Sequence, residues 1–109
     1  MVENARMIEL VVGDALMTVH PDEGGRIGAL RVRGHELLND DPSAAPFTWG
    51  CYPMVPWAGR VRRGRFAFDG HHYQMPANMP PHAIHGTGFT SRREVLDAGL
   101  DYCDLAPDL

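Results

Sequence analysis

The sequence predicts an all-β fold, and three observations support that class. Short runs of aliphatic and β-branched residues recur along the chain, and two-residue turn signals separate several of them. No stretch has the apolar spacing of a helix of ordinary length. The 109 residues are enough for one small domain. We therefore expect a single domain, 1–109, built as a sandwich or barrel of many short strands.

The first part of the chain predicts antiparallel strands joined by tight turns. Strands are expected over residues 7–12, 15–19, 26–32 and 35–38, which are rich in aliphatic and β-branched side chains. Gly13-Asp14 is a two-residue hairpin signal between the first two strands, and Arg33-Gly34 has the same place between the last two. Antiparallel pairing of neighbouring strands follows from these short connections.

The middle of the chain predicts irregular structure. Residues 39–46 are polar and contain two prolines, and we interpret them as an intradomain loop because similar strand patterns lie on both sides. Residues 49–56 carry Pro53 and Pro56, which exclude both a helix interior and a central strand. An extended but irregular path is expected there.

The second half contains the clearest hairpin of the sequence. Its two strands are expected over residues 64–68 and 71–75. Phe66 and Phe68 share one face of the first strand, and Asp69-Gly70 is a typical hairpin turn. Residues 84–88 form a short, glycine-flanked segment, and residues 93–98 fit either a strand or a helical turn.

Composition and charge narrow the class of protein. The formal net charge is −4, so no global positive field attracts nucleic acid or an anionic membrane. Cys51 and Cys103 are too few for a disulfide framework, and their spacing suggests neither a metal site nor a redox pair. The N-terminus lacks the pattern of a signal peptide, and no segment approaches the length of a membrane span. A cytoplasmic protein is the expectation.

Histidines gather in the second half of the chain. Four of the six lie at positions 71, 72, 82 and 85. His82 and His85 have H-x-x-H spacing, but residues three apart on a strand point to opposite faces, so only a turn could bring both to one ion. No carboxylate or cysteine stands at a matching offset. We expect no metal and no cofactor, which leaves structural histidines or a non-metal role in a pocket.

Arginines and tryptophans form a second group of candidates. The arginines at positions 60, 62, 63 and 65 would be split between two faces if a strand began at Val61, so most are expected to be solvated. Arg60 stands apart because it follows Ala58-Gly59, where missing side chains leave room for a ligand. Trp49 is expected in the core, and Trp57 fits either a core or a sugar-stacking position.

The run AGRVRRGRFAFDGHHYQMPANMPPHAIHG resembles the N-terminal signature of the aldose 1-epimerase (galactose mutarotase) family. That signature has an Ala-Asn-Arg-Ile segment, Gly-x-Phe, Asp-Gly-x-x-Tyr, an Asn and a closing His-Gly pair. Here the landmarks are Ala58, Gly59, Arg60 and Val61; Gly64 and Phe66; Asp69, Gly70 and Tyr73; Asn78; His85 and Gly86. Looser similarity extends back through GGRIGALRVRGHELL.

The resemblance implies a β-supersandwich, of which this chain is an incomplete N-terminal portion, and the interconversion of α and β anomers of a hexose. It also implies sugar-binding roles for Arg60 and His85. Family members are considerably longer, and their general-acid His and general-base Glu lie in the part that this chain lacks, so its catalytic residues stay unknown. Exposed strand edges then predict a homo-oligomer or a complementary chain, besides the sugar itself, as partners.

Two departures from the family signature keep alternatives open. Gly59 replaces a frequent sugar-contacting Asn, which removes one amide and leaves the sugar unidentified. The chain also diverges after Gly88. Mutarotation needs an acid and a base. His72, His82 or His85 could supply one of them. Glu36 or Asp69 could supply the other, although Asp69 fits a turn better. A non-catalytic carbohydrate-binding module, a hexose-phosphate mutarotase and a metal-binding barrel of the cupin kind are the other readings.

Overall fold

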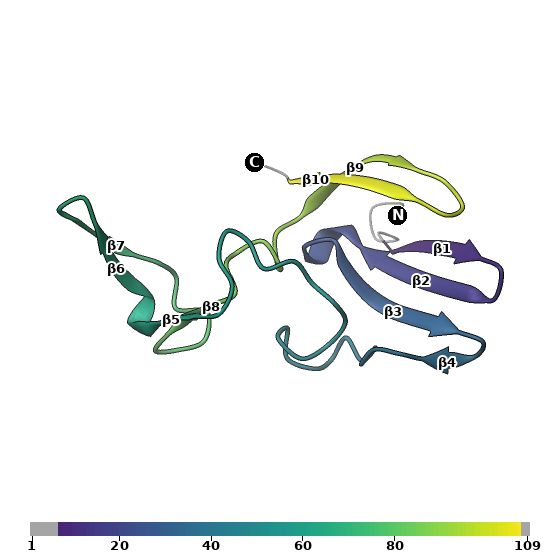
Figure 1. The fold of residues 1–109 in the computed structure, drawn as a ribbon, viewed down its shortest axis with the longest axis horizontal. Helices are drawn as coiled ribbons and strands as arrows, with labels where there is room; N and C mark the ends of the chain where they lie inside the picture. Colours follow the sequence, from purple (N-terminus) through teal and green to yellow (C-terminus); the bar gives the residue numbers. More distant parts are fainter. Residues whose placement is uncertain (1–6, 108–109) are drawn as a thin grey trace. The chain divides into compact units, whose positions relative to one another are not determined.

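The computed structural model describes residues 7–107, and within them the regular secondary structure consists of short antiparallel strands and two 3₁₀ turns (Figure 1). This confirms the all-β class. The chain separates into two compact units. The sheet unit holds the described residues up to Pro53 together with those from Phe89 onward, and the hairpin unit is Met54–Gly88. No helix within the described residues is long and apolar enough to cross a membrane.

Four strands of the sheet unit form one antiparallel sheet in sequence order, β1-β2-β3-β4 (Figure 1). They are β1 (Ile8–Val12), β2 (Ala15–His20), β3 (Arg26–Val32) and β4 (His35–Glu36). Val12 pairs with Ala15 across the Gly13-Asp14 turn, so the first predicted hairpin is confirmed. A short 3₁₀ turn, η2 (Pro21–Glu23), joins β2 to β3.

A second hairpin completes the sheet unit, formed by β9 (Arg93–Ala98) and β10 (Cys103–Pro107). The structure resolves residues 93–98 as a strand rather than a helical turn. β10 lies outside the strands expected from the sequence, because no closing signal was recognised in residues 100–109. The connection between the two strands contacts β1, since the Val11 N–H donates to the Leu100 carbonyl at 2.8 Å.

A buried arginine organises the core of the sheet unit. Arg26 is 1% exposed, and its guanidinium lies 4.6 Å from the ring centroids of both Trp49 and Tyr52. Its Nη1 donates to the carbonyls of Pro46 and Trp49 at 2.7 Å each, and Nη2 donates to the Phe89 carbonyl at 3.4 Å. Arg26 therefore fixes the irregular path that was expected over 49–56. Trp49 is 3% exposed, which confirms its core position.

The hairpin unit contains two small two-stranded sheets. Its elements are β5 (Arg60–Val61), η3 (Arg62–Gly64), β6 (Arg65–Phe68), β7 (His71–Gln74) and β8 (Ala83–Ile84). β6 pairs with β7 through a turn in which Asp69 and Gly70 have φ angles of 52° and 76°, as a type I′ turn requires. β5 pairs with β8. The 3₁₀ turn η3 separates β5 from β6, so no continuous strand runs through the arginines.

Candidate functional site

The pairing of β5 with β8 brings the two predicted sugar-binding residues to one small sheet. Arg60 pairs with Ile84 in the register of the two strands. One position further, the His85 N–H donates to the Gly59 carbonyl at 2.9 Å. Arg60 begins β5, and His85 directly follows the end of β8, one position out of register with Arg60. That their side chains contact the same ligand stays a prediction.

The ring of His85 is tied to the backbone of the facing strand. The Gly59 N–H donates to His85 Nδ1 at 3.0 Å, so this nitrogen carries no hydrogen and the neutral ring holds its proton on Nε2. Gly59 has a φ of 83°, and a Cβ built there would meet no atom within 4 Å. The open space expected beside Arg60 is therefore present, next to an imidazole that has an N–H donor at its far side.

Asn78 holds the backbone on both sides of His85. Its Oδ1 accepts the Ile84 N–H at 2.7 Å, and its Nδ2 donates to the carbonyls of Ile84 and Gly86 at 2.9 and 3.2 Å. His85 itself has a φ of 61°, which a non-glycine residue adopts only when neighbouring contacts impose it. We infer that Asn78 is a positioning residue for His85. The sequence marked Asn78 as a family landmark but gave it no role.

Arg60 is exposed, and its described side-chain contact is to a neutral atom. Nη2 lies 3.3 Å from the sulfur of Met79, which belongs to the turn before β8. A thioether is a weak acceptor. The guanidinium of Arg60 therefore keeps most of its hydrogen-bonding capacity for solvent or a ligand.

The other histidines have separate positions. His82 Nδ1 accepts the Arg63 N–H at 2.9 Å, which leaves Nε2 of the neutral ring as a donor. His71 and His72 are consecutive and exposed residues of β7, so their side chains point to opposite faces. Within residues 7–107, no group of three His, Cys, Asp or Glu side chains is close enough to hold a metal ion.

Two carboxylates that could act as acid or base have structural contacts instead. Glu36 accepts the backbone N–H groups of Leu30 at 2.9 Å and Leu38 at 3.1 Å, and Arg31 Nε donates to it at 3.2 Å. The bond from Leu30, followed by those from Leu38 and Arg31, holds the pKa of Glu36 below its usual value. Asp69 forms the β6–β7 turn, as its sequence position indicated.

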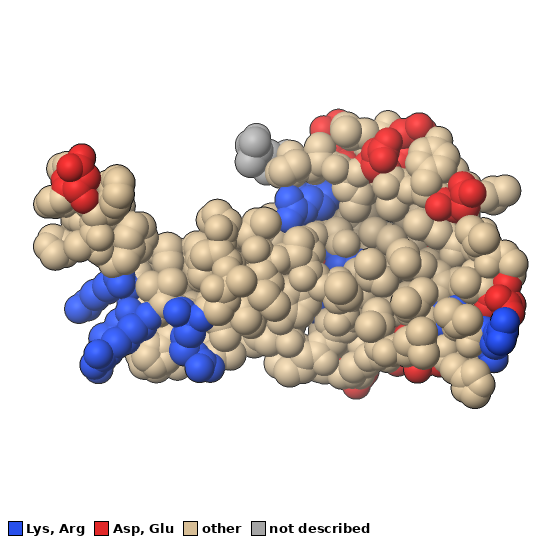
Figure 2. All heavy atoms as spheres, in the orientation of Figure 1, with Lys and Arg blue, Asp and Glu red and all other residues tan. Residues whose placement is uncertain are grey.

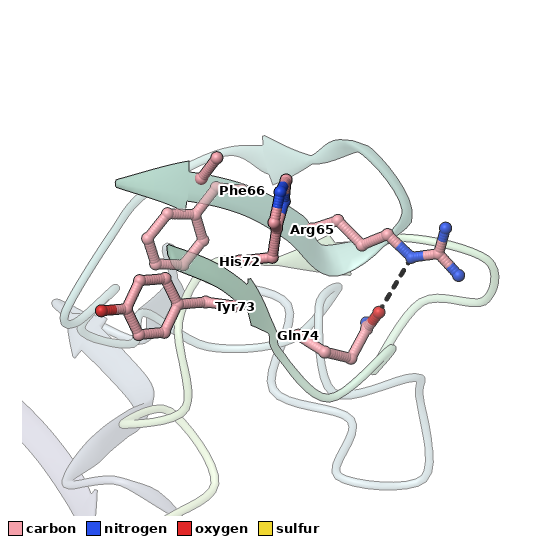
Figure 3. A pocket seen from close by; sticks show the side chains of 6 residues that line it. Arg65, Phe66, His72, Tyr73 and Gln74 are labelled. Atoms are coloured by element: carbon pink, nitrogen blue, oxygen red, sulfur yellow. Dashed lines mark hydrogen bonds between the residues drawn. The ribbon is translucent and has the colours of Figure 1, made fainter. Parts of the chain in front are cut away.

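A shallow hollow of about 390 Å³ lies on the β6–β7 hairpin (Figure 3). It is lined by Arg65, Phe66, Ala67, His72, Tyr73 and Gln74. The rings of Phe66 and Tyr73 stack across the two strands with centroids 5.0 Å apart, and Arg65 Nε donates to Gln74 Oε1 at 3.0 Å. Neither Arg60 nor His85 lines this hollow. Sequence reasoning did not single it out, although the cross-strand aromatic pair follows from the predicted hairpin register.

Comparisons with known proteins agree on one family. The family model of aldose 1-epimerase matches residues 6–95. Galactose mutarotase of Rattus norvegicus is 36% identical over 56 residues, which are 47% of this chain and 16% of that protein. The uncharacterized protein YphB of Escherichia coli (strain K12) is 42% identical over 71 residues, which are 62% of this chain and 24% of that protein.

Solved structures show the same similarity in three dimensions. A candidate aldose 1-epimerase from Escherichia coli K12 aligns with a TM-score of 0.77 and 27% identity, over 91% of this chain and 35% of that one. A homologue of these epimerases from C. elegans aligns with a TM-score of 0.70 at 21% identity, over 91% of this chain and 34% of that one. The fold is therefore part of the β-sandwich of these structures, as expected. The chain spans about a third or less of the length of each relative.

Proposed function

This chain belongs to the aldose 1-epimerase family, and we propose that it binds a hexose and serves the interconversion of the α and β anomers of that sugar. Arg60 and His85 contact the sugar in this proposal. The observation that supports it most directly is the β5–β8 pairing: Gly59, which precedes Arg60 and has open space around it, hydrogen-bonds the ring of His85.

The two residues suit different parts of a sugar. The guanidinium of Arg60 keeps its charge at any ordinary pH and donates hydrogen bonds to hydroxyl oxygens. The ring of His85 is held in a fixed orientation, because its Nδ1 accepts the Gly59 N–H and the proton of the neutral ring is on Nε2. In this proposal Arg60 and His85 orient a pyranose without taking its protons. We therefore assign binding and orientation to Arg60 and His85.

Anomer interconversion needs a base that removes the proton of the C1 hydroxyl and an acid that protonates the ring oxygen. We assign neither role within this chain, because the carboxylates of Glu36 and Asp69 have the structural positions described above. The proposal is therefore that the chain supplies sugar-binding residues to a mutarotase whose acid and base lie elsewhere. It predicts sugar binding that is separable from catalysis.

Two measurements on the purified chain test this proposal. Ligand-observed NMR detects binding of glucose and galactose, and polarimetry of freshly dissolved α-anomers measures mutarotation. We expect binding that Arg60→Ala and His85→Ala each weaken, while His35→Ala, an exposed histidine of the sheet unit, leaves it unchanged. Anomer equilibration at the buffer rate is the expected polarimetric result. The binding proposal is wrong if neither sugar binds, and rapid equilibration would show that a complete acid and base pair is present.

A non-catalytic carbohydrate-binding module is the second candidate, and the hollow on the hairpin favours it. Phe66 and Tyr73 are 45% and 44% exposed and stack on each other, so their rings offer an apolar surface for the C–H face of a sugar. If Phe66→Ala and Tyr73→Ala abolish sugar binding while Arg60→Ala does not, the hollow is the binding site and the first proposal fails.

A further inference from the structure

A further cavity lies in the sheet unit and has a volume of about 310 Å³, at the lower end of the range of small-molecule sites. One wall is the face of β1, β2 and β3 that carries Glu9, Thr18 and Ala29. These residues form one row across the sheet, because Thr18 pairs with Glu9 on one side and with Ala29 on the other. The other wall is the segment after β4, which contributes Asp40 and Trp49. We call this space the sheet cavity.

A glycine in β3 shapes one end of the sheet cavity. The register of β2 and β3 shifts after Thr18, so Gly28 stands at a β-bulge and has no residue opposite it. A Cβ built at Gly28 would collide with the ring of His20, so this ring lies directly over the backbone of β3. The same ring contacts Trp49 edge to face, with the ring centroids 5.4 Å apart. Gly28, His20 and Trp49 all line the cavity.

Two polar side chains inside the sheet cavity keep hydrogen-bonding capacity. Thr18 is 8% exposed, and the described contact of its hydroxyl is to His20 Nε2 at 3.4 Å, which is a long hydrogen bond. A hydroxyl group can donate one hydrogen bond and accept two. Burial lowers the pKa of His20, so its ring is neutral at neutral pH and has one donor and one acceptor nitrogen. Thr18 and His20 can therefore bind a hydroxyl group of a ligand.

The charged residues that line the sheet cavity leave it acidic. Glu9 is exposed and has no ion pair within residues 7–107. Arg31 also lines the cavity, but its charge is compensated by Glu36 and Asp40, at 3.2 and 3.6 Å. A ligand therefore meets carboxylate oxygens, which accept hydrogen bonds and attract cations.

The charge of the whole sheet unit acts in the same direction. Residues 7–53 and 89–107 carry eleven acidic side chains and five arginines, which gives a formal charge of −6. Figure 2 shows part of this excess as red side chains along β9 and β10. An electrostatic potential of this sign attracts cationic ligands and repels anionic ones.

We propose that the sheet cavity binds a small hydroxylated cation of the amino alcohol or amino sugar class. The ammonium group of the ligand pairs with Glu9, and one of its hydroxyl groups bonds to Thr18 and His20. Its carbon skeleton lies against Leu16 and Pro42, which also line the cavity. This site is independent of the proposed sugar-binding function, because all of its lining residues belong to the sheet unit.

Calorimetric titration of the chain with glucosamine, N-acetylglucosamine and glucose tests the inference. The three sugars share a ring, but only glucosamine carries an ammonium group. We expect glucosamine to bind about tenfold more tightly than the other two at low salt. Glu9→Gln should remove this preference, and circular dichroism verifies that the variant keeps its strands. Glu94→Gln is the matched control, because it makes the same change at an exposed position of β9 outside the cavity, and it should keep the preference.

NMR spectra of the isotope-labelled chain locate the bound glucosamine. Its addition should shift the backbone amide signals of Thr18 and Gly28. Equal binding of the three sugars, or a preference for glucosamine that Glu9→Gln retains, overturns the inference and leaves the proposed function intact. Shifts confined to the signals of Gly59 and His85 also overturn it, because glucosamine then binds at the proposed sugar site. Failure of the proposed function is seen separately, as the absence of glucose binding.

Discussion

Replacing Arg26 by methionine should unfold the sheet unit at markedly lower denaturant. The two hydrogen bonds of 2.7 Å from Nη1 involve a charged donor, and each such bond contributes roughly 1.5–3 kcal/mol. Burial lowers the pKa of Arg26, and its Nε has no hydrogen-bond partner in the structure, so desolvation offsets part of that gain. Methionine fills much of the same volume between Trp49 and Tyr52. We expect a net loss of about 3 kcal/mol.

Urea unfolding followed by tryptophan fluorescence measures this loss, and Arg31→Met is its control. Arg31 is 55% exposed at its side chain and has two ion pairs, with Glu36 and Asp40. Exposed ion pairs contribute at most about 1 kcal/mol each, so this variant should stay close to the parent chain. The m-value should be the same for all three proteins, because the surface exposed on unfolding hardly changes.

The comparison of the two variants is decisive, because a count of ion pairs predicts that Arg31→Met loses more stability than Arg26→Met. Arg26 has no acidic partner in the described contacts, whereas Arg31 has two. Equal losses in the two variants, or a loss below about 1 kcal/mol for Arg26→Met, would refute the conclusion that Arg26 holds the irregular segment to the core.

Three further predictions follow from local contacts. Asn78→Ala removes three hydrogen bonds around His85 and should cost about 2 kcal/mol in urea unfolding while also weakening sugar binding in the NMR assay. Gly86→Ala should lower the free energy of unfolding by more than about 3 kcal/mol, because Gly86 has a φ of 74° and an added Cβ would collide with the Val55 carbonyl. Gly70→Ala is its control and should lower the free energy of unfolding less, because Gly70 has a similar φ of 76° but open space around it. Burial lowers the pKa of His20 below the 6.5 of the unfolded chain, so protonation of His20 favours unfolding. The melting temperature should therefore stay constant above about pH 6.5 and decrease as the pH is lowered further. His20→Gln should reduce that decrease.

Local turn chemistry explains which parts of the fold could be predicted from the sequence. Gly13-Asp14 and Asp69-Gly70 determine their hairpins within four residues, and both hairpins are present. β5 and β8 have two residues each, too few for any periodicity, so Arg60 and His85 are candidates from a family motif and not from a strand pattern.

Contacts between distant segments explain what could not be predicted. An arginine at the start of a strand is usually exposed, and the burial of Arg26 depends on carbonyls 20, 23 and 63 positions away. Asn78 likewise gains its role only when residues 84–86 fold back on it. β10 depends on its pairing with β9, and the sequence of β10 alone does not indicate that pairing.

The hydrogen bond that anchors His85 uses the amide of residue 59 and not its side chain. Any residue except proline can therefore stand at this position and keep the imidazole in place, provided that it tolerates a φ of 83°. Asparagine does so more readily than most residues. If the proposed sugar site is correct, exchanging this one side chain should change ligand preference without dismantling the anchor, which makes Gly59→Asn a natural first step in redesigning selectivity.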